Sequence, residues 1–86
     1  MTYLRRMIKF AALFNEDLRV NLNVNDEITV DVPYVGKIEG IMNRSVFGSG
    51  DDIESACRDY LSKATGHFVR ERGGDYTRIE RTVTAV

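Results

Sequence analysis

The chain has 86 residues, of which 43% are hydrophobic and 29% are charged, and its net charge at pH 7 is -1. This length predicts one small domain over residues 1–86 with one modest core, and the near-zero charge excludes a strong overall attraction to nucleic acid or to a membrane surface. The single cysteine, Cys57, excludes an intrachain disulfide and is typical of a reducing compartment. The apolar run over residues 10–14 is too short to span a bilayer, and Asn15-Glu16-Asp17 offers no small-residue cleavage site. We therefore expect a cytoplasmic, unprocessed protein without membrane contact.

Residues 4–14 fit two secondary structures. The apolar residues that would share one face of a helix are Leu4, Met7, Ile8, Ala11 and Phe14. The apolar residues that would alternate along a strand are Ile8, Phe10, Ala12 and Phe14. Periodicity does not separate the two, and we favour a strand because Asn15-Glu16-Asp17 is typical of a turn into another extended run.

Residues 18–32 alternate between apolar and polar side chains. The apolar positions are Leu18, Val20, Leu22, Val24, Ile28, Val30 and Val32, and Asn25-Asp26 interrupts them. This pattern predicts an antiparallel hairpin with one buried and one solvated face, ended by Pro33. Over residues 34–47 we expect a third strand, bulged at Gly40, that leads into a Gly48-Ser49-Gly50 turn.

Residues 51–64 have the clearest helical pattern in the chain. The residues on its apolar face are Ile53, Ala56, Cys57, Tyr60, Leu61 and Ala64. Asp51 is a suitable N-cap, and Glu54 three residues later completes an Asp variant of the capping box. Asp59 and Lys63 form a favourable i,i+4 pair, and Gly66 supplies a left-handed stop.

The last segment predicts a second hairpin around Gly73-Gly74. A two-residue turn there places Arg72 opposite Asp75 and Phe68 opposite Ile79. In this register Phe68, Ile79 and Val83 share the core face. We therefore predict an α+β fold, with an antiparallel sheet of about four to five strands and one helix, Asp51–Ala64, packed on one face.

Near the helix, three features suggest a phosphate site, a cation site and a nucleophile–base pair. The neighbouring residues make each of these interpretations unfavourable. Gly48-Ser49-Gly50 resembles a phosphate cradle, but Asp51 and Asp52 lie where a phosphate would bind, and these two carboxylates alone make a weak cation site. Cys57 and His67 suggest a nucleophile and base, but Cys57 lies on the apolar face and no residue is placed to orient His67. We expect no catalytic residue, no metal and no cofactor.

The best binding candidates lie in the last hairpin. They are Arg70, Arg72, Tyr76 and Arg78, and Arg81 follows them. Arginine beside an aromatic side chain suits phosphate contact and base stacking. Glu71, Asp75 and Glu80 are interleaved with them, which is typical of a solvated strand face with cross-strand pairs. We predict that these four residues contact a partner, and we favour a protein over nucleic acid.

Two resemblances concern residues already discussed. The segments Val32–Gly36 and Gly48–Ala56 resemble HicB-type antitoxin domains, in which a strand runs through a glycine-containing turn into a helix with an acidic start. The Phe14–Val20 segment and the Asp59–Lys63 segment are similar to small phage and prophage proteins of unknown function. The second resemblance covers nearly the whole chain and implies an accessory protein of a mobile element.

Together these observations lead to a functional expectation. We expect a non-enzymatic phage-type protein that binds and modulates a host protein, with an anti-defence, anti-CRISPR-like role suited to its size. The alternative is a nucleic-acid-binding or HicB-like antitoxin module acting through the same arginines. A homodimer formed through a sheet edge or through the exposed helix face is a further expectation.

Overall fold

The computed structural model describes residues 1–72 and 78–84. The elements in these ranges are α1 (Thr2–Ala12), β1 (Arg19–Leu22), β2 (Ile28–Asp31), β3 (Val35–Glu39), β4 (Met42–Ser45), β5 (Gly48–Gly50), α2 (Ile53–Lys63), β6 (Gly66–Arg70) and β7 (Ile79–Val83). The strands form two antiparallel sheets, one in the order β1-β2-β5 and one in the order β4-β3-β6-β7. The predicted α+β class is confirmed, although the strands divide between two sheets and a second helix is present.

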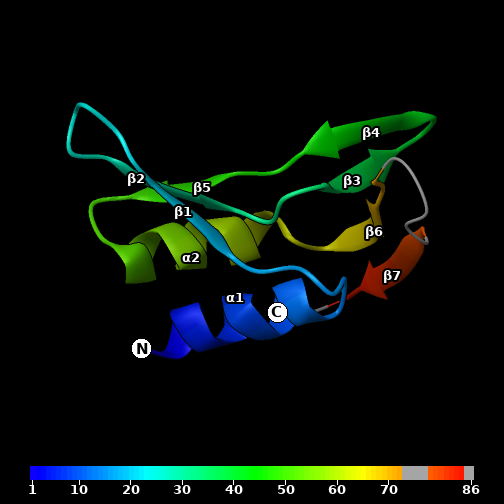
Figure 1. The fold of residues 1–86 in the computed structure, drawn as a ribbon, viewed down its shortest axis with the longest axis horizontal. Coiled ribbons are helices and arrows are strands. Elements are labelled where there is room, and N and C mark those ends of the chain that lie inside the picture. Colours follow the sequence, from blue (N-terminus) through cyan, green and yellow to red (C-terminus); the bar gives the residue numbers. More distant parts are fainter. Residues whose placement is uncertain (73–77, 85–86) are drawn as a thin grey trace.

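Both helices lie on the same side of the sheets (Figure 1). α2 packs against β5 and β2, and α1 packs against α2. The β1–β2 and β3–β4 hairpins extend from this body at opposite ends of the molecule (Figure 1). Neither helix of the described ranges is long and apolar enough to cross a membrane.

The prediction of a strand over residues 4–14 is wrong, because this segment forms α1. Its inner face carries Met7, Phe10 and Ala11, which are buried. A contact from α2 stabilises its first turn, where the Glu54 carboxylate accepts hydrogen bonds from the N–H groups of Tyr3 at 2.8 Å and Leu4 at 3.1 Å. These bonds satisfy amides at the start of a helix whose N-cap, Met1, makes no side-chain bond.

The predicted helix over residues 51–64 is confirmed, with small differences at its ends. The N-cap is Asp52 rather than Asp51, and its Oδ1 accepts a 2.7 Å hydrogen bond from the Ser55 N–H. Glu54 caps α1 and does not complete a capping box. The Asp59–Lys63 pair is present at 3.0 Å, and the apolar face is buried as predicted. Gly66 begins β6 and does not cap the helix.

The predicted hairpin over residues 18–32 is confirmed, with Arg19 opposite Asp31 and Leu22 opposite Ile28. The predicted burial of one whole face holds for β2 but not for β1, where Val20 is 40% and Leu22 is 80% exposed. The reason is the position of β1 as the outer strand of its sheet, since its main packing partner is β2 and neither helix covers it closely.

Residues 34–50 differ from the prediction in two places. Gly40 has φ 63° and lies between β3 and β4, so the expected bulged strand is in fact a hairpin. Gly48-Ser49-Gly50 forms β5, paired with β2, rather than a turn. Gly48 is required here because an added Cβ would lie 2.1 Å from the carbonyl oxygen of Ala56 in α2.

The β6–β7 hairpin is also confirmed, but its register is shifted by two residues. Ile79 lies opposite Arg70, not opposite Phe68. The shift is even, so Phe68 and Val83 keep the predicted face and are buried, and Ile79 packs against the core. The predicted turn at Gly73-Gly74, with Asp75 and Tyr76, lies outside the described residues.

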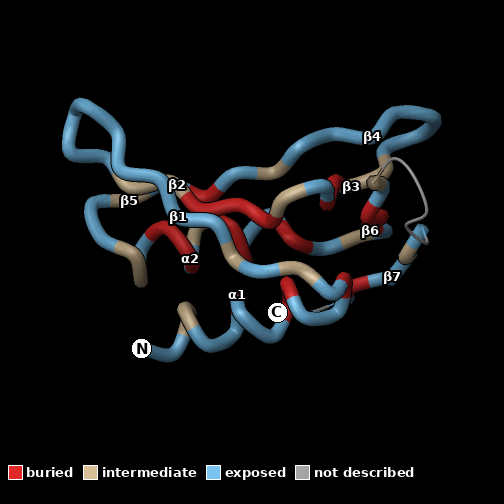
Figure 2. Tube along the Cα trace, in the orientation of Figure 1, coloured by how far each residue is buried: buried red, intermediate tan, exposed pale blue. Residues whose placement is uncertain are grey.

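The core lies between the sheets and the two helices, where the buried residues gather (Figure 2). Phe10 of α1 is at its centre. The Phe10 ring centroid lies 5.4 Å from that of Phe14, 5.5 Å from that of Tyr60 and 5.2 Å from that of Phe68. These tilted and edge-to-face contacts join α1, α2 and β6 into one hydrophobic unit.

Candidate functional site

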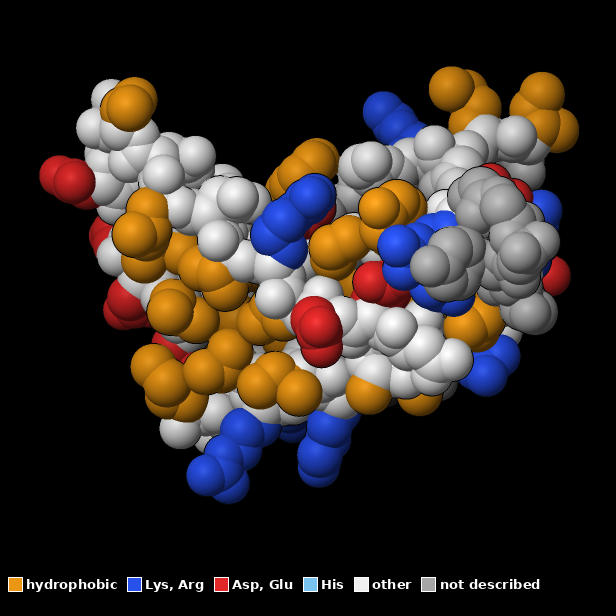
Figure 3. All heavy atoms as spheres, viewed as in Figure 1, with side chains coloured by type: hydrophobic (Ala, Val, Ile, Leu, Met, Phe, Trp, Pro, Cys, Tyr) orange, Lys and Arg blue, Asp and Glu red, His pale blue; other side chains and the backbone are white. Residues whose placement is uncertain are grey.

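A concave surface lies between the two projecting hairpins (Figure 3). It encloses a hollow of about 300 Å³. We call this surface the saddle and define it by the lining residues Arg19, Asp31, Tyr34, Asn43 and Phe47. These residues come from β1, β2, β4 and two connecting segments, so both sheets contribute to the surface.

Tyr34 lines the saddle and lies in the turn between β2 and β3. The Val35 N–H donates to the Val32 carbonyl at 3.2 Å, which closes a four-residue turn with Pro33 at its second position. Tyr34 occupies the third position with φ 66°. Pro followed by a residue with positive φ defines a type II turn, whose third position normally holds Gly or Asn. The Tyr34 side chain is nevertheless 55% exposed, so burial does not explain the choice of residue.

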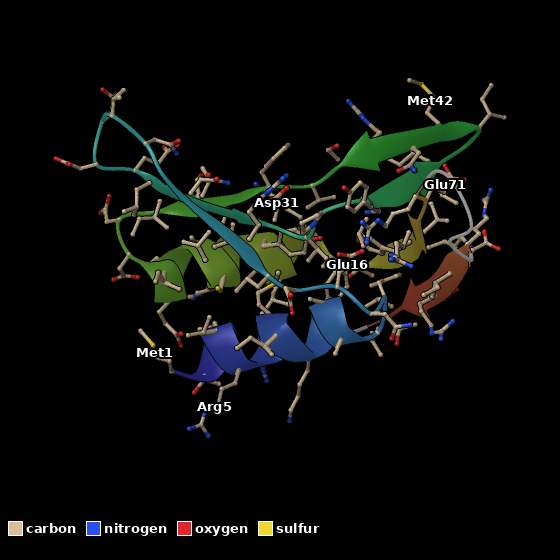
Figure 4. All side chains as sticks on the ribbon, viewed as in Figure 1. Met1, Arg5, Glu16, Asp31, Met42 and Glu71 are labelled. Atoms are coloured by element: carbon tan, nitrogen blue, oxygen red, sulfur yellow. The ribbon has the colours of Figure 1, made fainter. Side chains whose placement is uncertain are left out.

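An ion pair forms one wall of the saddle. Asp31 is buried and its two carboxylate oxygens each accept a hydrogen bond from the Arg19 guanidinium, through Nε at 2.8 Å and through Nη2 (Figure 4). The hydrogen bonds and charge of Asp31 raise the pKa of Arg19. This two-point contact fixes the guanidinium plane at the rim of the hollow. Phe47, 51% exposed, adds a second accessible aromatic ring.

The structure places the four predicted binding residues in different environments. Arg70 is buried, and its Nε lies 2.7 Å from the carboxylate of Glu16, which is labelled in Figure 4. Arg72 lies 3.8 Å from the same carboxylate. Arg78 contacts Glu71 at 2.7 Å. Tyr76 lies outside the described residues.

Arg72 connects this predicted group to the saddle. Its guanidinium carbon lies 4.6 Å from the centroid of the Tyr34 ring, which is a cation–π contact. Arg78 is separate, on the exposed face where it contacts Glu71 and Glu80. The structure therefore brings Arg72, but not Arg78, into contact with Tyr34. The partner-binding role of all four residues stays a prediction.

Cys57 and His67 do not form a nucleophile–base pair. Cys57 is fully buried on the inner face of α2, and burial, with a contribution from the Glu54 charge, raises the pKa of its thiol to about 11. His67 lies on the surface of β6, where its ring nitrogens contact Thr82 at 3.0 Å and Glu80 at 3.2 Å. The cysteine therefore stays a protonated thiol at neutral pH, and the histidine contacts side chains of β7.

The glycine-containing segment before α2 is occupied by protein contacts. The Ser49 N–H donates to the Asp59 carboxylate at 2.9 Å, and this bond is the main cause of the lowered pKa of Asp59. The backbone amide that a phosphate would use is therefore already bonded to a carboxylate. Within the described ranges, no group of three or more His, Cys, Asp or Glu side chains is placed to hold a metal ion.

Sequence reasoning did not select the aromatic residues of the saddle. The signal for Tyr34 is present in Val32-Pro33-Tyr34-Val35, because Pro predicts the second position of a turn and places a tyrosine where Gly is usual. Phe47 and the Arg19–Asp31 pair carry no such local signal, since the hollow forms only when the two hairpins lie opposite each other. No protein-family model matches the chain, and no curated protein or solved structure matches it significantly.

Proposed function

We propose that this chain is a non-enzymatic binding protein that modulates a partner protein, and that the saddle is the surface that contacts this partner. The observation that carries the proposal is Tyr34. This aromatic residue is exposed, and its backbone has a positive φ, which is unfavourable for a bulky side chain. Left-handed φ values at bulky residues are uncommon and gather at ligand-binding and active sites. A glycine at this position would satisfy the turn, so the proposal assigns the tyrosine to recognition.

The chemistry of the saddle suits a protein contact. Tyr34 and Phe47 are accessible aromatic residues, and Arg72 lies against the Tyr34 ring. Tyrosine and arginine are enriched among the residues that dominate the free energy of protein–protein binding. The two charged residues that define the saddle, Arg19 and Asp31, pair with each other, so neither presents an unpaired charge to a partner.

Carboxylates argue against nucleic acid as the partner of this surface. Arg19 pairs with Asp31, and Glu16 lies within 4 Å of both Arg70 and Arg72. These two carboxylates offset two of the three positive charges, and the net charge of the whole chain is -1. A nucleic-acid surface relies on positive charge that releases counterions from phosphates. We therefore favour a protein partner over the antitoxin alternative.

The class of partner follows from the resemblance to small phage and prophage proteins. It leads us to propose a bacterial host protein as the target, with interference in a defence system as the role. The arrangement of the saddle supports a binding function of this kind.

The test is an affinity pull-down from bacterial lysate, with and without nuclease, followed by calorimetry on the purified partner. The baits are the wild type and the double variant Tyr34→Gly/Phe47→Ala. We expect the double variant to lose at least about tenfold in affinity, because each residue is placed as an aromatic anchor. Leu13→Ala is the matched control, since Leu13 is 46% exposed and lies at the end of α1, outside the saddle.

A second pair of baits tests the arginines predicted from the sequence. Arg72→Ala should weaken binding, because it removes the cation that lies against Tyr34, whereas Arg78→Ala should do so only if the β7 face also takes part. Equal retention of a partner by wild type and Tyr34→Gly/Phe47→Ala would show that the saddle is not the binding surface. Recovery of nuclease-sensitive material alone would favour the nucleic-acid alternative.

A further inference from the structure

β1 is an outer strand of its sheet, and its free edge carries backbone hydrogen-bonding groups. The Asn23 N–H donates to the Glu27 carbonyl at 2.9 Å, so Asn23 and Glu27 form a hydrogen-bonded pair of the hairpin. Such pairs alternate along an antiparallel ladder. Asn21 and Arg19 therefore direct their backbone groups toward β2, and Val20 and Leu22 direct theirs away from the sheet. β1 thus presents outward-facing N–H and C=O groups at these two residues.

The two outward-facing residues, Val20 and Leu22, do not protect this edge from pairing. Outer strands are normally protected by charged residues, proline, bulges or a covering element. From Val20 to Leu22 of β1, and on through the connection over residues 23–25, the chain carries no charge, Pro or Gly. Leu22, the last residue of β1, is 80% exposed. An outer strand whose outward-facing residues carry neither charge nor proline is open to pairing with another strand.

The apolar row of β1 is part of a larger patch. Figure 3 shows hydrophobic side chains gathered along β1 and over the first half of α1 on one face of the molecule. The exposed large hydrophobic residues in these elements include Ile8 of α1 and Val20 and Leu22 of β1, and Met1, just before α1, is also exposed. A strand added to β1 would place its own apolar row beside this patch and cover part of it.

We propose that two copies of this chain pair through β1, antiparallel and around a two-fold axis. The strand is self-complementary in this arrangement, because Val20 and Leu22 face each other across the pair and Asn21 faces its own counterpart, whose amide both donates and accepts. No like charges meet within residues 20–25.

One register uses both outward-facing residues of the strand. Val20 then pairs with Leu22 of the partner subunit, and Asn21 lies on the two-fold axis opposite Asn21 of the partner subunit. The saddle is outside this contact except for Arg19 at its rim, so dimer formation and partner binding are separable properties.

The first test measures the mass of the protein by sedimentation over a series of concentrations. We expect a monomer–dimer equilibrium for the wild type. Leu22→Lys should weaken the dimer by more than about tenfold, because the two-fold axis brings two introduced charges close together and lysine is a natural protector of strand edges. Met42→Lys is the matched control, since Met42 is an exposed residue of β4, the outer strand of the other sheet. It should leave the dimer unchanged.

The second test examines the register by disulfide cross-linking. In a non-hydrogen-bonded antiparallel pair the Cα atoms are about 4.5 Å apart, which is within the range of a disulfide. Asn21→Cys should therefore form a covalent dimer on mild oxidation, whereas Asn23→Cys should not, because its counterpart lies farther along the partner strand. Cys57 is buried and serves in both variants as an unreactive background.

Sedimentation tests whether β1 forms the dimer contact, and cross-linking tests the register. A wild-type protein that stays monomeric at every concentration, or a dimer that Leu22→Lys leaves intact, would overturn pairing through β1. Cross-linking of Asn23→Cys in preference to Asn21→Cys would overturn the register. Circular dichroism of Leu22→Lys, expected to match the wild type because the side chain is exposed, separates a lost contact from a lost fold.

Discussion

Tyr34 has a backbone conformation that costs a tyrosine free energy, and the surrounding turn shows how the fold tolerates it. Its φ of 66° places Cβ close to a backbone oxygen, a clash that costs roughly 1–2 kcal/mol for a residue other than glycine. Pro33 holds the second position of the turn, and the Glu71 N–H donates to the Tyr34 carbonyl at 3.1 Å. These constraints set the conformation whatever side chain is present.

The first prediction concerns stability at this position. Tyr34→Gly should change the free energy of unfolding by no more than about 1 kcal/mol, because relief of the left-handed strain offsets both the lost Arg72 contact and the greater freedom of glycine when unfolded. Tyr34→Val should destabilise by about 1–2 kcal/mol, since a β-branched residue is worse than tyrosine at positive φ. Urea unfolding of the three proteins measures this.

A loss of more than about 2 kcal/mol in Tyr34→Gly would contradict this account. It would show that the tyrosine side chain is needed by the fold itself. The argument that assigns Tyr34 to recognition would then lose its basis.

At the scale of elements, the sequence predicts a helix or strand correctly where the residues of that segment carry the signal. It fails where a contact with a residue far along the chain stabilises the segment. α2 has an apolar stripe, an acidic start and an i,i+4 pair within its own residues, and it is found close to the predicted bounds. α1 has an equally apolar face, but its first amides bond to Glu54, about fifty residues away. The pattern of residues 4–14 cannot predict this bond, because its acceptor, Glu54, lies outside the segment.

The outer strand β1 also shows what a local pattern predicts and what it does not. Alternation in residues 18–32 correctly predicts pairing of β1 with β2. Alternation does not report which strand ends at the edge of a sheet, so the exposure of Leu22 is not predictable from it. The saddle, which needs two hairpins placed opposite each other, is beyond local pattern for the same reason.

The second prediction concerns the contact between the helices. Hydrogen bonds from the Tyr3 N–H, and in smaller part from the Leu4 N–H, lower the pKa of Glu54 below its usual 4.5. The folded state thus binds fewer protons at this carboxyl than the unfolded state does. The resulting stability is present above pH 4.5 and is lost as the pH falls through the folded-state pKa. Glu54→Gln should therefore lower the Tm at neutral pH.

Thermal unfolding of wild type and Glu54→Gln from pH 7 downward measures this difference. We expect the two Tm values to differ by several degrees at neutral pH and to converge in acid, where the wild-type carboxyl is also neutral. Asp51→Asn is the control, because Asp51 is exposed and lies one residue outside the N-cap of α2. A Tm difference between wild type and Glu54→Gln that persists at the lowest pH would assign it to side-chain shape rather than charge.

At the scale of the whole molecule, a buried ion pair joins the N-terminal half to the four-stranded sheet. Glu16 follows α1 and leads into β1, and its carboxylate lies 2.7 Å from Nε of Arg70 in β6. Both side chains are no more than 10% exposed. Arg72, 3.8 Å from the same carboxylate, also lies against Tyr34. The contact therefore connects α1, the four-stranded sheet and the saddle.

The third prediction compares this buried pair with an exposed one. Glu16→Ala should lower the free energy of unfolding by about 3 kcal/mol, because it removes the carboxylate from a guanidinium that stays in a desolvated environment. Glu39→Ala is the matched control, since Glu39 pairs with Arg44 at 3.1 Å on the surface and both side chains are about half exposed or more. Its loss should cost less than about 1 kcal/mol. Urea unfolding of both variants gives the comparison. The dependence of the free energy of unfolding on urea concentration is checked against that of the wild type.

The same variants test how the saddle depends on the buried pair. If Glu16 fixes the position of Arg72, Glu16→Ala should weaken partner binding under conditions in which the protein is still folded, and Glu39→Ala should not. Equal stability costs for the two variants would show that the Glu16–Arg70 pair is as well solvated as the surface pair. In that case α1 and the four-stranded sheet would be held together by the aromatic contacts of Phe10 with Phe68, and not by charge.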